Sequence, residues 1–242
     1  AFFGAAGCSL PRIESAILRL KDSLGTAPWG MNLIHSPGEP EMEAATVELY
    51  LKHGVSVVSA SAYIDLTPSV VRYRVTGLKR DAAGRVVAPN KILAKVSRTE
   101  VARRFLAPPP KALLDGLLAE GLISASEAEL ASEIPMAEDI TAEADSGGHT
   151  DNRPLVVLLP ELLALRDEVS AEHGYLQSPR VGAAGGISTP ASTAPSSTST
   201  SRGATRRRAE RGEGARVFEG IQKSCDLGLA RLSASNTWGP TR

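Results

Sequence analysis

The stretch GMNLIHSPGEPEMEAATVELYLKHGVSVVSASAY (residues 30–63) decides the fold class. An apolar run of strand length (29–35) precedes a helical pattern (40–53), and a second, β-branched run follows (55–63). Pro40 marks the start of the helix and Gly54 its end, and Glu48 and Lys52 have i,i+4 spacing for an ion pair. Strand, helix and strand in this order predict two parallel strands joined by a crossover helix.

The same alternation continues toward the C-terminus. Apolar runs predict three further strands, at residues 91–97, 139–145 and 180–187. Helical patterns cover residues 67–75, two helices within 108–135 and the stretch from Leu155 to Val169, while residues 81–87 indicate a turn into an extended segment. Ser124 and Glu127 have capping-box spacing for the second helix of the pair.

This repetition predicts an α/β fold with a parallel sheet. A doubly wound sheet and a (β/α)8 barrel both fit the periodicity. In either fold the active site lies at the carboxyl ends of the strands, so the residues that end each strand are the candidates for chemistry.

Composition divides the chain into two parts. The 242 residues include 42% hydrophobic residues and balanced charges, with 27 Lys+Arg and 27 Asp+Glu. Residues 1–190 carry a net charge of −5 and residues 191–242 a net charge of +5. Twelve of the 14 residues from Ser188 to Ser201 are Ser, Thr or Pro, and no apolar periodicity follows. We therefore expect one domain over residues 1–190 and a low-complexity basic tail over 191–242, disordered or out of frame.

Several classes of protein are excluded. Two cysteines are too few for a disulfide framework or a cysteine zinc site, and no HExxH, CxxC, P-loop or GxSxG pattern occurs, so we expect no metal site. The sequence contains no run of about 18 apolar residues, the length that a membrane-spanning helix needs. The start (AFFGAAGCSLPR) lacks the pattern of a signal peptide. We expect a cytoplasmic protein, and the absence of an initiator Met suggests a fragment or a processed chain.

The segment TAEADSGGHTDNRP (141–154) is the most informative candidate for a site. Gly147 and Gly148 let the backbone leave a strand in conformations closed to other residues. His149 is thereby placed at a strand exit, where an imidazole can act as acid, base or hydrogen-bond donor. Glu143 and Asp145 point to the same side of the strand. Asp151 or Asn152 can cap the next helix, with Pro154 in its first turn. A purely structural turn explains the segment about equally well.

Three further signals fall at strand ends. Gly185 and Gly186, in GAAGGIST (182–189), could hold a phosphate with their backbone N–H groups, although a tight turn is at least as good an explanation. Asn32 lies inside an apolar strand and must find a polar partner. Lys95, in ILAKV, needs an anionic partner or a lowered pKa if it is buried. Their occurrence on successive strands favours a shared anionic ligand.

These residues resemble a known family. The stretch from Gly30 to Leu78, the segment MAEDITAEADSGGHTDNRPLVVLLPELLALRDEV and the run RVGAAGGI are similar to the PfaD-type enoyl reductases of polyunsaturated fatty acid and polyketide synthases. That family belongs to the nitronate monooxygenase-like flavoproteins, which are FMN-binding TIM barrels. The resemblance covers roughly residues 1–190, and EADSGGHTDNRP is an unusual and specific string.

The resemblance implies a fold, a cofactor and a reaction. The fold is a TIM (β/α)8 barrel, incomplete in this chain. NADPH would reduce FMN, and hydride would pass to the β-carbon of an enoyl thioester on an acyl carrier protein, with a protein acid or solvent protonating the α-carbon. His149 matches the family's catalytic histidine beside the flavin. The cofactor-binding positions matched in the same way are Asn32, Lys95, Gly147, Gly148, Gly185 and Gly186. Nitronate oxidation, with His149 as the base, is the enzymatic alternative.

The resemblance also implies parts that this sequence lacks. The family barrel has one strand before Phe2, and after GAAGGIST it continues into an Ala-rich helix and another strand. The Ser/Thr/Arg-rich run here is what a frameshift would produce, so we expect residues after about Ala194 to be out of frame. A different hypothesis is a binding module whose basic arm, centred on Arg206–Arg208, contacts nucleic acid or an acidic partner. Absent aromatic interleaving and a recognition helix argue against a nucleic-acid partner.

Overall fold

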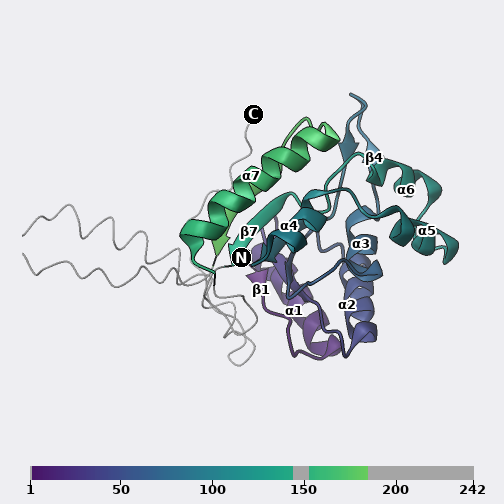
Figure 1. Ribbon diagram of the computed structural model, residues 1–242. Coiled ribbons are helices and arrows are strands. Elements are labelled where there is room, and N and C mark those ends of the chain that lie inside the picture. Colours follow the sequence, from purple (N-terminus) through teal and green to yellow (C-terminus); the bar gives the residue numbers. More distant parts are fainter. Residues whose placement is uncertain (1, 144–152, 185–242) are drawn as a thin grey trace, which may run out of the picture.

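The computed structural model describes residues 2–143 and 153–184, which form a parallel sheet with helices on one side (Figure 1). The sheet has six strands in the order β1-β2-β3-β6-β7-β8, and every neighbouring pair is parallel. The strands are β1 (Phe2–Phe3), β2 (Gly30–Ile34), β3 (Val57–Ser61), β6 (Lys91–Val96), β7 (Asp139–Glu143) and β8 (Arg180–Ala184). The predicted α/β class is confirmed.

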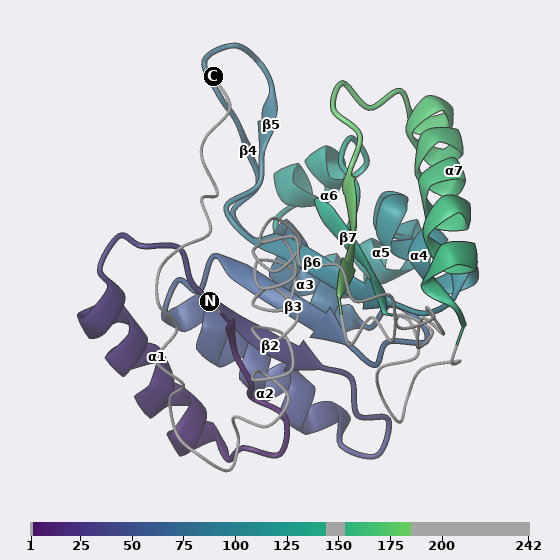
Figure 2. The ribbon, with the colours of Figure 1, turned by 90° about the vertical axis from the view of Figure 1, so that its left-hand side faces the viewer.

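Seven helices and one hairpin connect these strands in the described part of the chain. The helices are α1 (Leu10–Leu24), α2 (Pro40–Lys52), α3 (Pro68–Val75), α4 (Thr99–Leu106), α5 (Lys111–Ala119), α6 (Ala125–Ala131) and α7 (Leu155–His173). The hairpin pairs β4 (Lys79–Arg80) with β5 (Val86–Val87) in antiparallel fashion. It projects from the body of the domain in Figure 2. None of the described helices is long and apolar enough to cross a membrane.

The order of the strands in space is their order along the chain. A doubly wound sheet reverses direction at a switch point, whereas a barrel adds each strand to the same side of the previous one. The described strands contain no such reversal, so the doubly wound alternative is wrong for this part of the chain. Closure into a full eight-stranded barrel stays a prediction.

The two faces of the sheet differ in chemistry. Side chains alternate between faces along a strand, and the register pairs Met31 with Val58, and Asn32 with Ser59. The helix-covered face is apolar, and each of its side chains is at most 2% exposed. They are Met31, Leu33, Val58, Ala60, Ile92, Ala94, Val96, Ile140 and Ala142. The opposite face, here called the polar face, carries Asn32, Ser59, Ser61, Lys95, Thr141 and Glu143.

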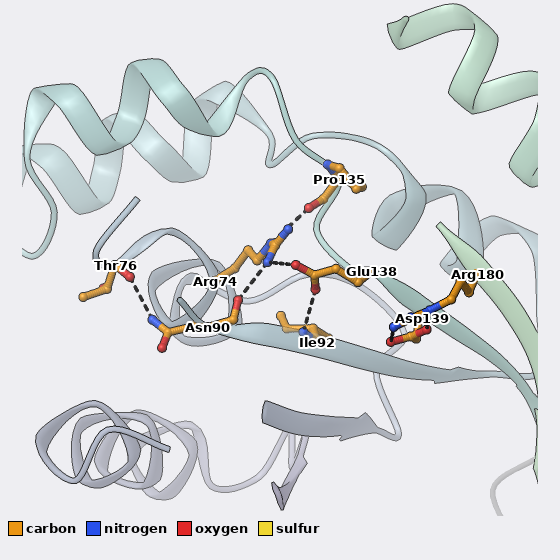
Figure 3. Close-up of polar contacts among 8 residues, drawn as sticks. All are labelled: Arg74, Thr76, Asn90, Ile92, Pro135, Glu138, Asp139 and Arg180. Carbon is orange, nitrogen blue, oxygen red and sulfur yellow. Dashed lines mark hydrogen bonds and ion pairs between the residues drawn. The ribbon is translucent and has the colours of Figure 1, made fainter. Parts of the chain in front are cut away.

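A buried ion pair joins the elements at the amino end of the sheet (Figure 3). Arg74 of α3, 2% exposed, donates from Nη1 to Glu138 Oε1 (2.5 Å) and to the Asn90 carbonyl (2.8 Å), and from Nε to the Pro135 carbonyl (3.0 Å). Glu138 Oε2 also accepts the Ile92 N–H at 3.1 Å. One side chain of α3 thereby fixes the segments that enter β6 and β7.

Most predicted elements are confirmed with small shifts in their bounds. Pro40 opens α2 and Gly54 follows it with φ of 60°. The capping box of Ser124 and Glu127 is present in α6. Residues 81–87 form the turn and second strand of the hairpin.

Several other expectations are wrong. Glu48 pairs with Arg72 of α3 and Lys52 with Glu14 of α1, rather than with each other, because a neighbouring helix offers each a partner. Pro154 is the N-cap of α7 and not a residue of its first turn. Helices α1 and α4 and the two-residue strand β1 were not predicted.

Candidate active site

Two predicted site residues, Asn32 and Lys95, lie on the polar face of the sheet. They are not in contact, because β3 separates their strands and Lys95 lies one two-residue step further along. Strand spacing and rise place their Cα atoms roughly 10–12 Å apart. Each side chain has a partner within the sheet, so a shared anionic ligand stays a prediction.

Lys95 has the anionic partner that its position requires. Its Nζ lies 2.5 Å from Glu143 Oε1 on the neighbouring strand β7, and the two side chains are 13% and 8% exposed. Burying one charge alone would be costly, and the pair offsets that penalty. The predicted need for an anionic partner is confirmed, and Glu143 supplies it. The sequence had predicted only the side of the strand to which Glu143 points.

Asn32 is held by β3 and α2. Its Nδ2 donates to the Ser59 carbonyl (3.0 Å) and to Ser61 Oγ (2.9 Å). The backbone carbonyl of Asn32 accepts from the Tyr50 hydroxyl at 2.7 Å. Burial raises the pKa of Tyr50, so this phenol stays a donor. The amide oxygen Oδ1 is thereby fixed in orientation on the polar face.

A second polar cluster lies at the carboxyl edge, between the sheet and α2. Glu43 of α2, 4% exposed, accepts from the Tyr63 hydroxyl (3.0 Å) and from the Thr67 hydroxyl, and its Oε2 lies 3.0 Å from His35 Nδ1. His35 follows β2 and Tyr63 follows β3, and their rings stack at 5.3 Å. Ala62, between β3 and Tyr63, has a φ of 63°, which is unusual for a residue other than glycine.

The sequence did not reveal this cluster. The signal it did contain was Glu43 itself, which shares one side of α2 with the buried residues Val47 and Tyr50 at helical spacing. Burial raises the pKa of Tyr63, and the charge of Glu43 raises it further, so Tyr63 stays a hydroxyl donor to the carboxylate.

The other predicted site residues, His149, Gly147, Gly148, Gly185 and Gly186, lie outside the described residues, as does the basic tail (191–242). The described residues hold no group of three or more potential metal ligands. The polar face offers a fixed amide, three hydroxyls and a charge-paired lysine, a set suited to hydrogen bonding a polar ring.

No family model matches the chain. A polyunsaturated fatty acid synthase subunit from Thraustochytrium sp. is 48% identical over 194 residues, which are 79% of this chain and 13% of that protein. Polyketide biosynthesis protein PksE of Bacillus subtilis is 47% identical over 190 residues, 78% of this chain and 25% of that protein. The solved enoyl reductase domain of MlnA from Bacillus amyloliquefaciens is 40% identical with a TM-score of 0.72, and the match covers 76% of this chain and 42% of that one. The chain thus spans well under half the length of each of these proteins.

Proposed function

The chain is homologous to enoyl reductase domains of polyunsaturated fatty acid and polyketide synthases, and from this premise we propose that it is part of an FMN-dependent enoyl reductase. The substrate is an enoyl thioester carried on an acyl carrier protein, and NADPH is the hydride donor. The proposed fold of the complete catalytic unit is a (β/α)8 barrel, of which this chain supplies six consecutive parallel strands.

The observation that carries the proposal is the position of the Lys95–Glu143 pair. It lies at the carboxyl end of neighbouring strands, on the face opposite the helices, where singly wound α/β enzymes place their active sites. A buried ion pair is weak evidence for stability, because desolvation offsets much of its attraction. Its position at this edge favours a role in binding or chemistry.

The described residues fit a flavin in chemistry. The ring of FMN presents carbonyl oxygens and ring nitrogens that accept and donate hydrogen bonds, and the protein tunes it through such contacts. Lys95 Nζ and the Asn32 amide would face the ring, with Gly147, Gly148 and His149 beside it and Gly185 and Gly186 at the phosphate. Bound FMN supplies hydride transfer between NADPH and the β-carbon of the substrate.

Flavin binding by lysine variants tests the proposal. We expect the protein to bind FMN, and Lys95→Met to weaken binding by about 10-fold or more, since one hydrogen bond from a charged group contributes roughly 1.5–3 kcal/mol. Lys91→Met is the matched control, because Lys91 is exposed on the same face of the same strand at its amino end. K95M/E143Q also removes the negative charge that faces Lys95, and it separates loss of binding from loss of folding.

Turnover distinguishes the enzymatic alternatives. The holoprotein should oxidise NADPH when a crotonyl thioester is added. Oxygen uptake with a nitronate, without any enoyl reduction, would instead favour a nitronate monooxygenase. A protein that stays colourless with added FMN would overturn the proposal.

A further inference from the structure

Reduction of an enoyl thioester needs a proton at the α-carbon as well as hydride at the β-carbon. We propose that His35 delivers this proton from Nε2, and that Glu43 is the residue that positions its ring. The inference rests on the proposed function. It concerns a cluster that lies outside the predicted cofactor-binding residues.

The ring of His35 is fixed on one side and open on the other. Nδ1 lies 3.0 Å from Glu43 Oε2, and the Tyr63 ring stacks on the imidazole. Nε2 has no partner among the described residues. It is also not fully buried, because the buried side-chain atoms without a partner in this part of the chain are Arg72 Nε and Ser170 Oγ. The side chain is 17% exposed. One nitrogen is therefore held by the protein and the other is open to an incoming molecule.

Glu43 is suited to support a proton-donating histidine. Its side chain is 2% exposed and accepts hydrogen bonds from Tyr63 and Thr67, which hold the carboxylate in place. A carboxylate against Nδ1–H orients the imidazole, the arrangement used by histidines in proton transfer.

His35 belongs to the same edge of the sheet as the site. Its backbone N–H donates to the Ser61 carbonyl at 3.0 Å, and Ser61 Oγ accepts from Asn32 at 2.9 Å. The backbone of His35 and the amide of Asn32 are thus anchored to one residue at the end of β3. Residues that follow barrel strands at this edge are the usual source of catalytic groups.

The proposed step balances in atoms and charge. Hydride adds to the β-carbon, the carbon–carbon double bond becomes single, and the electron pair moves onto the thioester as an enolate. The N–H bond at Nε2 breaks, its proton forms the new C–H bond at the α-carbon, and neutral imidazole remains. Solvent then restores the proton at Nε2.

The chain contains a matched control for this pair. His53, 15% exposed at its side chain, has Nε2 at 2.7 Å from Glu14 Oε1. It lies at the opposite end of α2, at the amino edge of the sheet, and should have no part in the reaction. His35→Gln and His53→Gln therefore remove comparable His–Glu contacts from the two ends of one helix.

Half-reactions measured by stopped flow form the first test. We expect H35Q to slow reoxidation of the reduced holoprotein by a crotonyl thioester by about 100-fold or more. Its reduction by NADPH should change less than about twofold, and H53Q should leave both rates unchanged. Equal reoxidation rates in H35Q and H53Q would overturn the proposal.

Glu43→Gln tests the positioning role with little structural change. The amide oxygen can still accept from Tyr63 and Thr67, while the amide N–H now faces Nδ1 and forces the proton onto Nε2 of a neutral ring. Nitrogen-15 spectra of the imidazole should show that Nδ1 no longer carries a proton, together with a loss of reoxidation rate similar to that of H35Q. An Nδ1 that stays protonated in E43Q would remove Glu43 from the proposal.

The last measurement separates this proposal from the proposed function. If the wild-type protein binds no FMN or reduces no enoyl thioester, the proposed function fails. Titration with crotonyl-pantetheine still decides on His35, because a bound thioester should shift the Nε2 resonance of His35 and not that of His53. No shift in the wild-type protein would exclude the contact.

Discussion

Removal of the Arg74 guanidinium should be among the most destabilising single changes in the domain. Arg74 makes three hydrogen bonds, to Glu138 and to the carbonyls of Asn90 and Pro135, and the side chain is 2% exposed. Breaking a buried ion pair on one side destabilises a protein by about 3–5 kcal/mol, because the other charge stays buried. Glu138 is 27% exposed, so water can stabilise part of its charge. We therefore expect a loss of about 3 kcal/mol for Arg74→Met.

Urea unfolding followed by circular dichroism measures this loss. With a slope of about 2 kcal/mol per molar urea, the midpoint should fall by roughly 1.5 M. Arg85→Met is the control, because the ion pair of Arg85 with Asp81 in the hairpin is exposed and its loss should leave the midpoint nearly unchanged.

A second substitution tests the cause. Glu138→Gln in the R74M background removes the unpaired charge, while its amide oxygen can still accept the Ile92 N–H. The double variant should recover about 1 kcal/mol of the loss. A loss below about 1 kcal/mol in R74M, or a double variant no more stable than R74M, would refute the reasoning.

Three further stability predictions use the same unfolding assay. Gly174→Ala should destabilise by about 1 kcal/mol, since Gly174 ends α7 with φ of 63°. Gly116→Ala should instead stabilise by up to about 1 kcal/mol, because Gly116 lies inside α5 and an added Cβ would meet no other atom within 4 Å. The same sign for both variants would contradict the backbone explanation. Leu162→Ala, at a fully buried position of α7, should destabilise by about 2–5 kcal/mol, and a loss below about 1 kcal/mol would mean that the site collapses around the smaller side chain. Ser124→Ala removes the capping box of α6 and should lower stability by about 1 kcal/mol, with no effect expected on FMN binding.

The elements that the sequence predicted have explicit boundary residues or strong periodicity. Pro40 and Gly54 bracket α2. The apolar residues of α7 recur at helical spacing up to Val169, and Gly174 ends the helix. Of the missed elements, α1 carries both signals, with Pro11 in its first turn, Gly25 at its C-terminal end and buried residues at helical spacing, whereas α4 and β1 lack such boundary residues. Helix α4 has only eight residues and no side-chain cap, and β1 is two residues long and is defined only by its pairing with β2.

The site was predictable only where a single residue conflicts with its surroundings. Lys95 inside an apolar strand required a partner, but identifying Glu143 needs the strand order, which local patterns do not contain. Glu43 shows the same limit more strongly. Its three donors come from segments that follow β2 and β3 and from the N-cap of α3, and they converge only once the sheet has formed.

One signal in the sequence could have decided between the two folds that periodicity left open. In β3 and β7 the polar residues recur at every second position, at Ser59 and Ser61 and at Thr141 and Glu143, and β2 and β6 each place one polar residue, Asn32 and Lys95, on the same face. A doubly wound sheet is covered by helices on both faces, and its strands are therefore apolar on both. A second layer of helices would press apolar side chains against these polar residues, which is unfavourable. The alternation thus predicts a sheet with helices on one face only, and it leaves the polar residues on the other.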